Sequence, residues 1–414
     1  MSELERYDVV IESDRIIDPA SGLDGPGKLA IKDGRIAALG TKLPPHTATE
    51  TVDATGQIVC PGLIDMHVHV YEWVTNFGLP PDEAGVHSGA TTIIDQGSAG
   101  PWTVGGFKAY IADPAKTDVR SFVSANVAGA IMGGMEGTLL HNPDMMRIEA
   151  IIDAAADYPR LVKGIKSHGE SGGYSHWGTE VVKMAVEAGN KADLPLYVHT
   201  GELFPVDEDN RPAPDILMPA VLPLLRPGDT VAHVYSCMPD GILGPTGEVP
   251  SVVIEAYERG LHFDIGFGIN FSYRVARAMM EKGILPNTVG SDVHADFNSY
   301  HDDSKLDYSL CGAMTRLVAL GFPLADVIRR TTLNPAKILR EEDEIGTLAP
   351  GSLADITVLD PVAGRWSLPD AEGEVLTVDS RLVPAFVYRA GEKIVCSRKL
   401  VRDVWTADYP AAAE

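Results

Sequence analysis

Pro61-Gly62-Leu63-Ile64-Asp65-Met66-His67-Val68-His69 is the stretch that most constrains the fold of this chain. Alternate residues of a β-strand share a face, so His67 and His69 are expected on the same side of a strand. The apolar residues around the pair indicate that it ends a buried strand rather than lying on a solvated loop. Because histidine is the commonest metal ligand in proteins, the stretch predicts a metal site, provided that other segments supply further ligands.

The composition is ordinary for a soluble globular protein, but the net charge is strongly acidic. The 414 residues exceed the roughly 250 to 300 that one core usually holds, so we expect one large and one smaller domain. Lys and Arg total 34 against 58 Asp and Glu, which gives a net charge of −24. Such a charge repels polyanions, so neither nucleic acid nor an anionic membrane surface is an expected partner.

Neither a targeting segment nor a disulfide framework is indicated. The first seven residues lack the basic and apolar regions of a signal peptide, and no later window holds a membrane-length apolar run. We therefore expect a cytoplasmic protein. The four cysteines are widely separated and form no C-x-x-C pair, which favours reduced, buried thiols.

Two kinds of pattern divide the chain. Residues 7–59 contain short strand-like runs broken by turns, and strand-like runs return after residue 350. Between about 62 and 340, short apolar runs alternate with helical segments, which is typical of parallel β/α units. We expect an α/β fold in which 60–345 forms a (β/α)8 TIM barrel. The two termini, 1–59 and 346–405, would form one small β-sandwich domain.

Eight apolar runs are the candidate barrel strands. They lie at 62–70, 91–96, 120–128, 161–167, 195–200, 230–236, 261–267 and 287–292. The clearest helices between them are expected at 144–158, 179–191 and 272–283. Because a barrel of this kind carries its active site at the C-terminal ends of its strands, those ends are where ligands are expected.

Polar side chains end four of the later apolar runs. Lys166 ends the fourth run, His199 the fifth, His233 the sixth and Asp292 the eighth. Together with the first histidine pair they place six candidate ligands at one end of the barrel.

With these residues in place, the chain resembles the amidohydrolase superfamily over most of its length. The resemblance is carried by the His-x-His pair, Lys166, His199, His233 and Asp292, with the closing stretches 332–337 and 346–356. Within it, the segments 97–100, 164–166 and 291–294 resemble the dihydroorotase-like deacetylase branch. The resemblance implies a barrel with a two-part β-sandwich and a two-metal centre.

It also implies how the ligands divide between two metals. His67, His69 and Asp292 would bind the more buried ion, and His199 with His233 the more exposed one. Lys166 would bridge both ions as a carbamate formed with CO2, because a lysine at its ordinary pKa near 10.4 is a cation and cannot ligate. Lys163 is the alternative bridging residue, but strand alternation points it to the opposite face. The expected metal is Zn, with Mn, Fe or Co as alternatives.

The activity that the resemblance implies is metal-dependent hydrolysis of an amide or ester bond in a small organic acid derivative. A hydroxide bridging the metals would attack, and Asp292 would act as general base. One alternative is a cyclic amidohydrolase like dihydroorotase or hydantoinase, and another is a catalytically silent scaffold homologue. The expected partner is a small-molecule substrate, and the expected assembly is a homo-oligomer.

Substrate contacts are predicted from loops at the strand ends. The loop at 167–178 lacks the arginine that this branch commonly places after the bridging lysine, so we expect a substrate with an aromatic or neutral polar part. A substrate carboxylate would be met elsewhere, with Arg274 as the first candidate. The residues predicted to contact substrate are His168, Tyr174, His176, Arg274 and His294.

Overall fold

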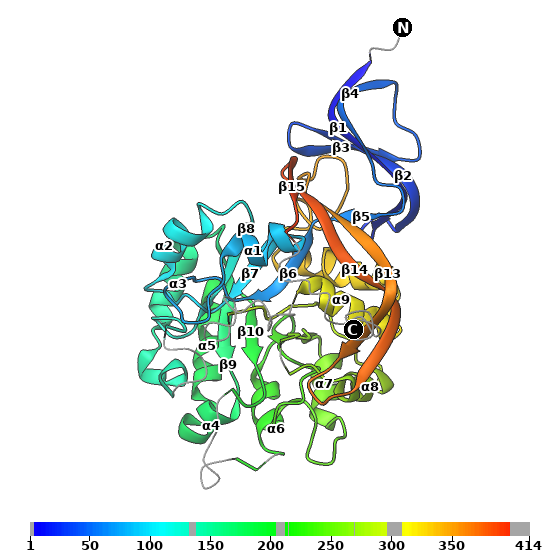
Figure 1. Cartoon of the computed structure of the whole chain (residues 1–414). Coiled ribbons are helices and arrows are strands. Elements are labelled where there is room, and N and C mark those ends of the chain that lie inside the picture. Colours follow the sequence, from blue (N-terminus) through cyan, green and yellow to red (C-terminus); the bar gives the residue numbers. More distant parts are fainter. Residues whose placement is uncertain are drawn as a thin grey trace.

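A computed structural model describes residues 4–131, 138–203, 212–213, 215–268, 270–295 and 309–397. Figure 1 shows a barrel of mixed helices and strands, with a β-rich domain projecting from one side of it. Within the described residues, no helix has the length and apolar character needed to cross a membrane.

A parallel sheet forms the wall of the barrel. Its strands follow one another in chain order, and each pairs in parallel with the next. The strands are β6 (Leu63–Val68), β7 (Ala90–Gln96), β8 (Asp118–Ser124), β9 (Val162–His168), β10 (Leu196–His199), β11 (Thr230–Val231) and β12 (His262–Phe263). The alternating pattern of the sequence thus predicted the position of each of these strands.

The eighth run closes the ring without forming a regular strand. Thr288 makes a parallel bridge to Asp264 beyond β12, and Val293 makes one to Val68 of β6. The backbone N–H of Asp292 also donates to the carbonyl oxygen of His67 at 2.7 Å. Asp292 has a left-handed φ of 53°, which interrupts the extended backbone that a strand needs. The (β/α)8 fold is therefore confirmed, although the expected strand at 287–292 is replaced by two single bridges.

Helices surround the barrel at the positions that the sequence indicates. The three clearest predictions correspond to α3 (Ile148–Asp157), α5 (Glu180–Ala192) and α8 (Tyr273–Glu281). The side chain of Ser272 caps α8 by accepting from the backbone N–H of Val275 at 3.2 Å. The other α-helices are α1 (Pro81–Ala84), α2 (Val104–Phe107), α4 (Ser171–Trp177), α6 (Leu217–Val221), α7 (Ser251–Glu258), α9 (Leu310–Ala319), α10 (Leu324–Arg330) and α11 (Leu333–Ile338). The short 3₁₀ and π turns are η1 (Val86–Ser88), η2 (Lys108–Ala112), η3 (Thr138–His141), η4 (Pro143–Met145) and η6 (Leu222–Leu224).

The β-rich domain takes its strands from both ends of the chain, as predicted. Its strands are β1 (Glu5–Asp18), β2 (Leu23–Lys32), β3 (Arg35–Gly40), β4 (His46–Asp53), β5 (Ile58–Pro61), β13 (Ile356–Pro369), β14 (Val375–Arg389) and β15 (Glu392–Val395). They form one sheet in the order β15-β14-β13-β5-β1-β2-β3, with β4 paired to β1. The two ends of the chain meet where β13 pairs antiparallel with β5, and side chains from both ends share one hydrophobic core.

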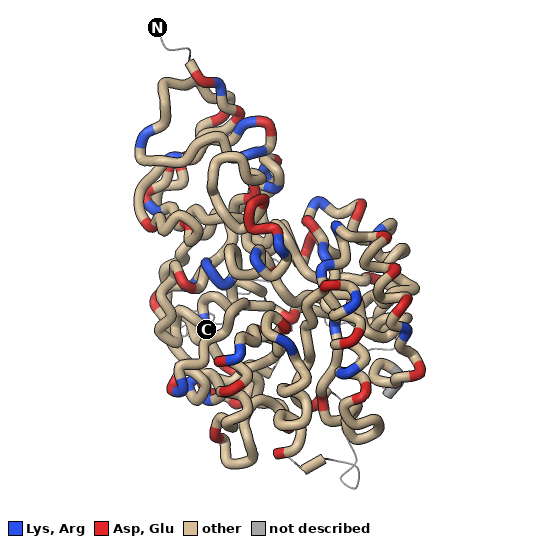
Figure 2. Tube along the Cα trace, turned by 180° about the vertical axis from the view of Figure 1, so that it is seen from behind, with Lys and Arg blue, Asp and Glu red and all other residues tan. Residues whose placement is uncertain are grey.

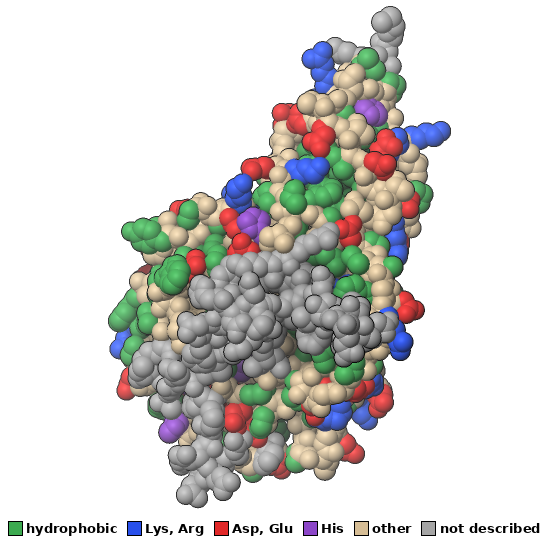
Figure 3. Space-filling model, in the orientation of Figure 1, with side chains coloured by type: hydrophobic (Ala, Val, Ile, Leu, Met, Phe, Trp, Pro, Cys, Tyr) green, Lys and Arg blue, Asp and Glu red, His purple; other side chains and the backbone are tan. Residues whose placement is uncertain are grey.

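The hairpin of β13 and β14 extends from this domain along the side of the barrel (Figure 1). Its tip binds the start of α8, because Asp370 accepts from the backbone N–H of Tyr273 at 2.8 Å. Glu374 at the tip also pairs with Arg277 at 2.6 Å. Figure 2 shows that acidic and basic residues are interspersed over both parts of the molecule, and Figure 3 shows both signs of charge on the projecting β domain.

A partly buried guanidinium joins the β domain to the barrel wall. Arg389 of β14 lies 3.2 Å from Asp118 of β8 and 3.1 Å from Asp355, and both carboxylates are buried. Removing the arginine takes a cation from the buried carboxylate of Asp355, whereas Asp118 keeps its pair with Arg120.

We expect Arg389→Met to lower the free energy of unfolding by about 3 kcal/mol, the low end for breaking a buried ion pair. The matched control is Arg277→Met, because that arginine pairs with Glu374 at the surface, where a pair contributes less than about 1 kcal/mol. Urea unfolding of the two variants checks this. Equal losses would show that burial of the Arg389 pairs has no special effect.

Candidate metal centre

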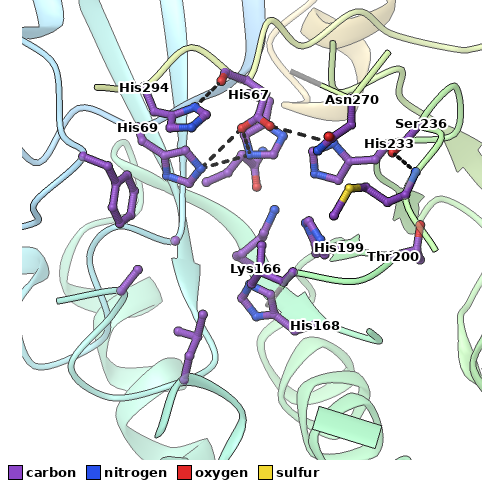
Figure 4. Close-up of a pocket in the computed structure, with 18 of the residues that line it drawn as sticks. His67, His69, Lys166, His168, His199, Thr200, His233, Ser236, Asn270 and His294 are labelled. Carbon is purple, nitrogen blue, oxygen red and sulfur yellow. Dashed lines mark hydrogen bonds and ion pairs between the residues drawn. The ribbon is translucent and has the colours of Figure 1, made fainter. Parts of the chain in front are cut away.

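The six predicted ligands, contributed by β6, β9, β10 and the segments after β11 and β12, line one pocket at the C-terminal end of the barrel. The cavity has a volume of about 170 Å³. Figure 4 shows five of them converging on one space, namely His67, His69, Lys166, His199 and His233. The pocket is lined by His67, His69, Phe77, Gln96, Gly97, Ala130, Leu140, Lys166, His168, His199, Thr200, Glu202, Leu203, His233, Ser236, Met238, Asn270, Asp292 and His294.

His67, His69 and Asp292 form the tightest group of candidate ligands. The Nε2 atoms of the two imidazoles lie 3.2 Å apart. Asp292 Oδ1 is 3.1 Å from His67 Nε2 and 3.6 Å from His69 Nε2. One ligand atom from each residue lies within 4.8 Å of the other two, a spacing that could hold one metal ion. This is the group that the resemblance assigns to the more buried ion.

Hydrogen bonds to Nδ1 orient three of the four histidines. His67 Nδ1 lies 3.1 Å from the Tyr197 hydroxyl, and His69 Nδ1 lies 3.0 Å from Ser98 Oγ. The corresponding atom of His233 donates to the carbonyl oxygen of Gly266 at 3.0 Å. When Nδ1 carries the proton, the lone pair resides on Nε2, which faces the pocket. This is the usual way in which proteins prepare an imidazole for a metal.

Two of the imidazole nitrogens lack any hydrogen-bond partner within the described part of the chain. They are the buried Nε2 atoms of His199 and His233, whose ring centroids are 4.4 Å apart. Burial lowers the pKa of both imidazoles, and lowers the pKa of His67 well below 6.5. Neutral buried imidazoles with bare nitrogens fit a cation, since a buried polar atom without a partner is otherwise costly.

Lys166 reaches the same space from β9. Its Nζ lies 4.8 Å from the centre of the Tyr197 ring, and the side chain is buried. Burial lowers the pKa of this amine to about 8, so a neutral form is more accessible than for an exposed lysine. Lys163 lies elsewhere, where its amine pairs with Glu341 at 2.8 Å. Only the first of these two lysines lines the pocket.

The backbone is strained at two of the candidate ligands. His233 and Asp292 have positive φ values of 59° and 53°, a conformation that costs a non-glycine residue on the order of 1 to 3 kcal/mol. Glycines give these side chains room, because a Cβ on Gly266 would lie 2.4 Å from His233 Nδ1. A Cβ on Gly268 would lie 2.7 Å from Asp292 Oδ2. Such strain is typical of functional sites.

Asp264, which sequence reasoning missed, forms hydrogen bonds that orient the candidate ligands. This buried carboxylate accepts hydrogen bonds from the Tyr197 hydroxyl at 2.8 Å and from Thr288 Oγ1 at 2.5 Å. The same hydroxyl lies 3.1 Å from the Nδ1 of His67. Asp264 therefore orients the candidate ligand His67 through the hydroxyl group of Tyr197. Its only sequence signal is an acidic residue inside the seventh apolar run, 261–267.

The predicted substrate residues separate into two groups. His168 and His294 line the pocket, and the ring of His168 lies 5.8 Å from that of His199. Tyr174 and His176 lie on α4 and are not among the lining residues.

Arg274 is not among the residues that line the metal pocket. Its guanidinium binds Glu372 at 3.0 Å, at the tip of the β13–β14 hairpin. It lines a neighbouring cavity that shares Ser236 and Met238 with the metal pocket, so its contact with a substrate stays a prediction. The prediction relied on nearness in sequence to the seventh strand, which does not reveal that α8 carries the side chain toward the hairpin.

Sequence reasoning also missed the neutral part of the lining. Gln96 is fixed by a hydrogen bond from its Nε2 to the Met66 carbonyl oxygen at 2.7 Å. Apolar lining residues such as Phe77 and Met238 come from irregular segments, and an isolated apolar residue in a loop carries no signal of its own. Position in space is the only property that identifies them.

Comparison with known proteins agrees with this geometry. A model of the Amidohydrolase family matches residues 272–395. A deacetylase from Agrobacterium fabrum is 28% identical over 371 residues, covering 89% of this chain and 87% of that protein. The fold resembles the crystal structure of an adenine deaminase with a TM-score of 0.81 and 26% identity, covering 94% of this chain and all of the other. A dihydroorotase structure gives a TM-score of 0.80 at 26% identity, with 94% and 98% coverage.

Sequence and structure point to the same family. The likeness extends over nearly the whole chain, both to the relative compared by sequence and to the two solved structures. The resemblance of this chain to the amidohydrolase superfamily is therefore confirmed.

Proposed function

We propose that this protein is a metal-dependent hydrolase that cleaves an amide or ester bond in a small organic acid derivative. The observation that carries the proposal is the convergence of six ligand-type side chains on one pocket, with the Nε2 atoms of His199 and His233 bare and buried. The deacetylase and dihydroorotase names of the relatives support hydrolysis of a C–N bond.

The donor set fits two divalent ions. His67, His69 and Asp292 would hold one, and His199 with His233 would hold the other. Lys166, between them, would bridge as an N-carboxylated lysine. Nitrogen and carboxylate ligands suit Zn best here, with Mn, Fe or Co as alternatives. When bound, such ions supply the Lewis acidity that lowers the pKa of a water and polarises a scissile carbonyl.

Asp292 is the group that would move the proton. One of its oxygens, Oδ1, faces the imidazoles of His67 and His69, while Oδ2 lies 3.9 Å from His233 Nδ1. A carboxylate at the centre of the ligand set can take a proton from the attacking water and deliver it to the leaving group. The backbone N–H of Asp292 donates to the carbonyl oxygen of His67, and this hydrogen bond helps to fix the orientation of the carboxylate.

A cyclic substrate is the second candidate. The structural likeness to a dihydroorotase favours it, since the name of that enzyme denotes a cyclic amide substrate. Turnover of acyclic N-acyl compounds compared with cyclic ureides separates the two. A silent scaffold is disfavoured by the complete set of candidate ligands.

Removal of metal should abolish activity. We expect chelated protein to be inactive and to regain activity with Zn or Mn, because the residues that line the described pocket include metal ligands but no serine or cysteine side chain hydrogen-bonded to a histidine side chain. Ser98, which contacts His69, is not a lining residue. Elemental analysis beside the activity assay checks this. Full activity in protein that contains no metal would contradict the proposal.

Replacing the bridging lysine should empty part of the centre. We expect Lys166→Ala to lose metal occupancy, and a short carboxylic acid to restore part of it by standing in for the carbamate. The matched control is Lys163→Ala, which removes a lysine from the same strand but from outside the pocket. Metal content of both variants is the measurement, and a reversal of the two results would reassign the bridge.

Removing the proton acceptor should slow turnover more than it weakens metal binding. We expect Asp292→Asn to retain much of the metal and to lose at least ~10²-fold in kcat, the low end of general acid–base contributions. The amide can still offer an oxygen ligand, but it cannot accept the proton. Steady-state kinetics at measured metal content tests this, and nearly normal turnover would exclude Asp292 as the base.

A further inference from the structure

Glu170 is a fully buried carboxylate that the proposed chemistry does not use. Its side chain is 0% exposed. Oε2 accepts from the backbone N–H of Gly172 at 2.7 Å, and Oε1 accepts from that of Gly173 at 2.6 Å, so it caps α4. The carboxylate also accepts from the backbone of Leu203, and His141 Nε2 lies 3.0 Å from Oε1. A buried charge with this many partners is expensive, and its partners show what it organises.

Those partners belong to three different strand-end loops. His141 lies after β8, the carboxylate itself after β9, and Leu203 after β10. The loops after β8 and β10 contribute Leu140 and Leu203 to the metal pocket, and the last residue of β9, His168, lines it just before the carboxylate. One side chain therefore fixes three adjacent parts of the lining relative to one another.

The lining that it fixes is largely apolar. Phe77, Ala130 and Leu140 form a small hydrophobic cluster, and Leu203 packs against it. All four line the pocket. Together they form a wall of the pocket, which we call the apolar wall.

His168 connects the same carboxylate to the metal ligands. The ring of His141 meets the ring of His168 edge to face, with centroids 4.9 Å apart. The second ring lies 5.8 Å from His199, and Figure 4 shows it beside Lys166 at the base of the pocket. The carboxylate thus acts on the pocket through neighbours and does not line it.

We propose that Glu170 is a positioning residue that assembles the apolar wall, and that this wall receives an uncharged apolar group of the substrate next to the bond that is cleaved. The inference rests on the proposed function and names its substrate class. The whole cavity, including the space between the candidate metal ligands, measures about 170 Å³, which is similar to the roughly 150 Å³ of a dry protein cavity that accommodates benzene.

Two hydroxamates that share one metal-binding head test the proposal. Acetohydroxamate presents only a methyl group beside the head, whereas phenylacetohydroxamate adds a benzyl group for the apolar wall. We expect the metal-loaded wild-type protein to bind the second compound more tightly. In Glu170→Gln we expect the affinity for acetohydroxamate to stay within about twofold and that for phenylacetohydroxamate to fall by about tenfold or more, the effect of losing apolar contact in a pocket.

The expected loss of affinity in Glu170→Gln has a physical reason, which is that the variant loses one of the two carboxylate oxygens that accept hydrogen bonds. A glutamine of the same size offers one oxygen, and its NH2 group would face backbone N–H donors at Gly172 or Gly173. The three loops would then shift relative to one another, while the metal ligands on the strands stay in place. Where Glu170→Gln does not fold, His141→Gln removes a contact with the same carboxylate and leaves the helix cap intact. The same selective loss is expected from it.

Ser309→Ala is the matched control. Ser309 is a buried N-cap whose Oγ accepts from the backbone N–H of Gly312 at 3.1 Å, on a helix whose residues do not line the pocket. It should reduce stability without changing the ratio of the two affinities.

The proposal would be overturned if the Glu170 and His141 variants bound both hydroxamates equally more weakly, or bound both as tightly as the wild-type protein does. It would also be overturned if Ser309→Ala showed the same change in selectivity. Failure of wild-type protein to bind metal or acetohydroxamate would instead overturn the proposed function, and the inference with it.

Discussion

The buried carboxylate of Asp264 is the interaction on which the geometry of the centre depends. It accepts from Tyr197 and Thr288 side chains and from the backbone N–H groups of Gly266 and Gly290, at 2.5 to 3.1 Å. These donors come from β10, from the end of β12 and from the segment that closes the ring. Burial raises the pKa of this carboxyl, so the donors offset only part of the cost of burying it. This cost arises where the last segment of the barrel forms no regular strand ladder, and there the hydrogen bonds to Asp264 help to hold the segment.

Much of the barrel could be predicted because its signals are local. An apolar run followed by a polar residue marks a strand that ends at the active face, and this rule places Lys166, His199 and His233 in one pocket. The two-ended β domain was also readable, from strand-like runs at both termini. The eighth run was predicted to be a regular strand, but it forms only two single bridges, and Asp292 has a left-handed φ that the apolar pattern does not indicate.

The lining of the pocket could not be predicted, because it depends on how loops lie in space. Arg274 follows the seventh strand closely, but α8 carries it away to Glu372. The sequence around Glu170 is typical of a polar loop, and no neighbouring residue indicates that its side chain is buried among three loops. The periodicity of the sequence indicates which ligands lie at strand ends. The residues that surround the substrate are brought together by packing between distant segments, which periodicity does not indicate.

The pairing of β5 with β13 also has a consequence for synthesis of the chain. During translation, the N-terminal strands leave the ribosome almost 300 residues before their partner at Ile356, with the edge at Ile58–Pro61 open. An unpaired strand edge is a template for pairing with other chains. The nascent protein therefore lacks the partner of this edge until the whole barrel has been synthesised, and we expect its yield in cells to respond to holdase chaperones and to the speed of elongation as well as to final stability.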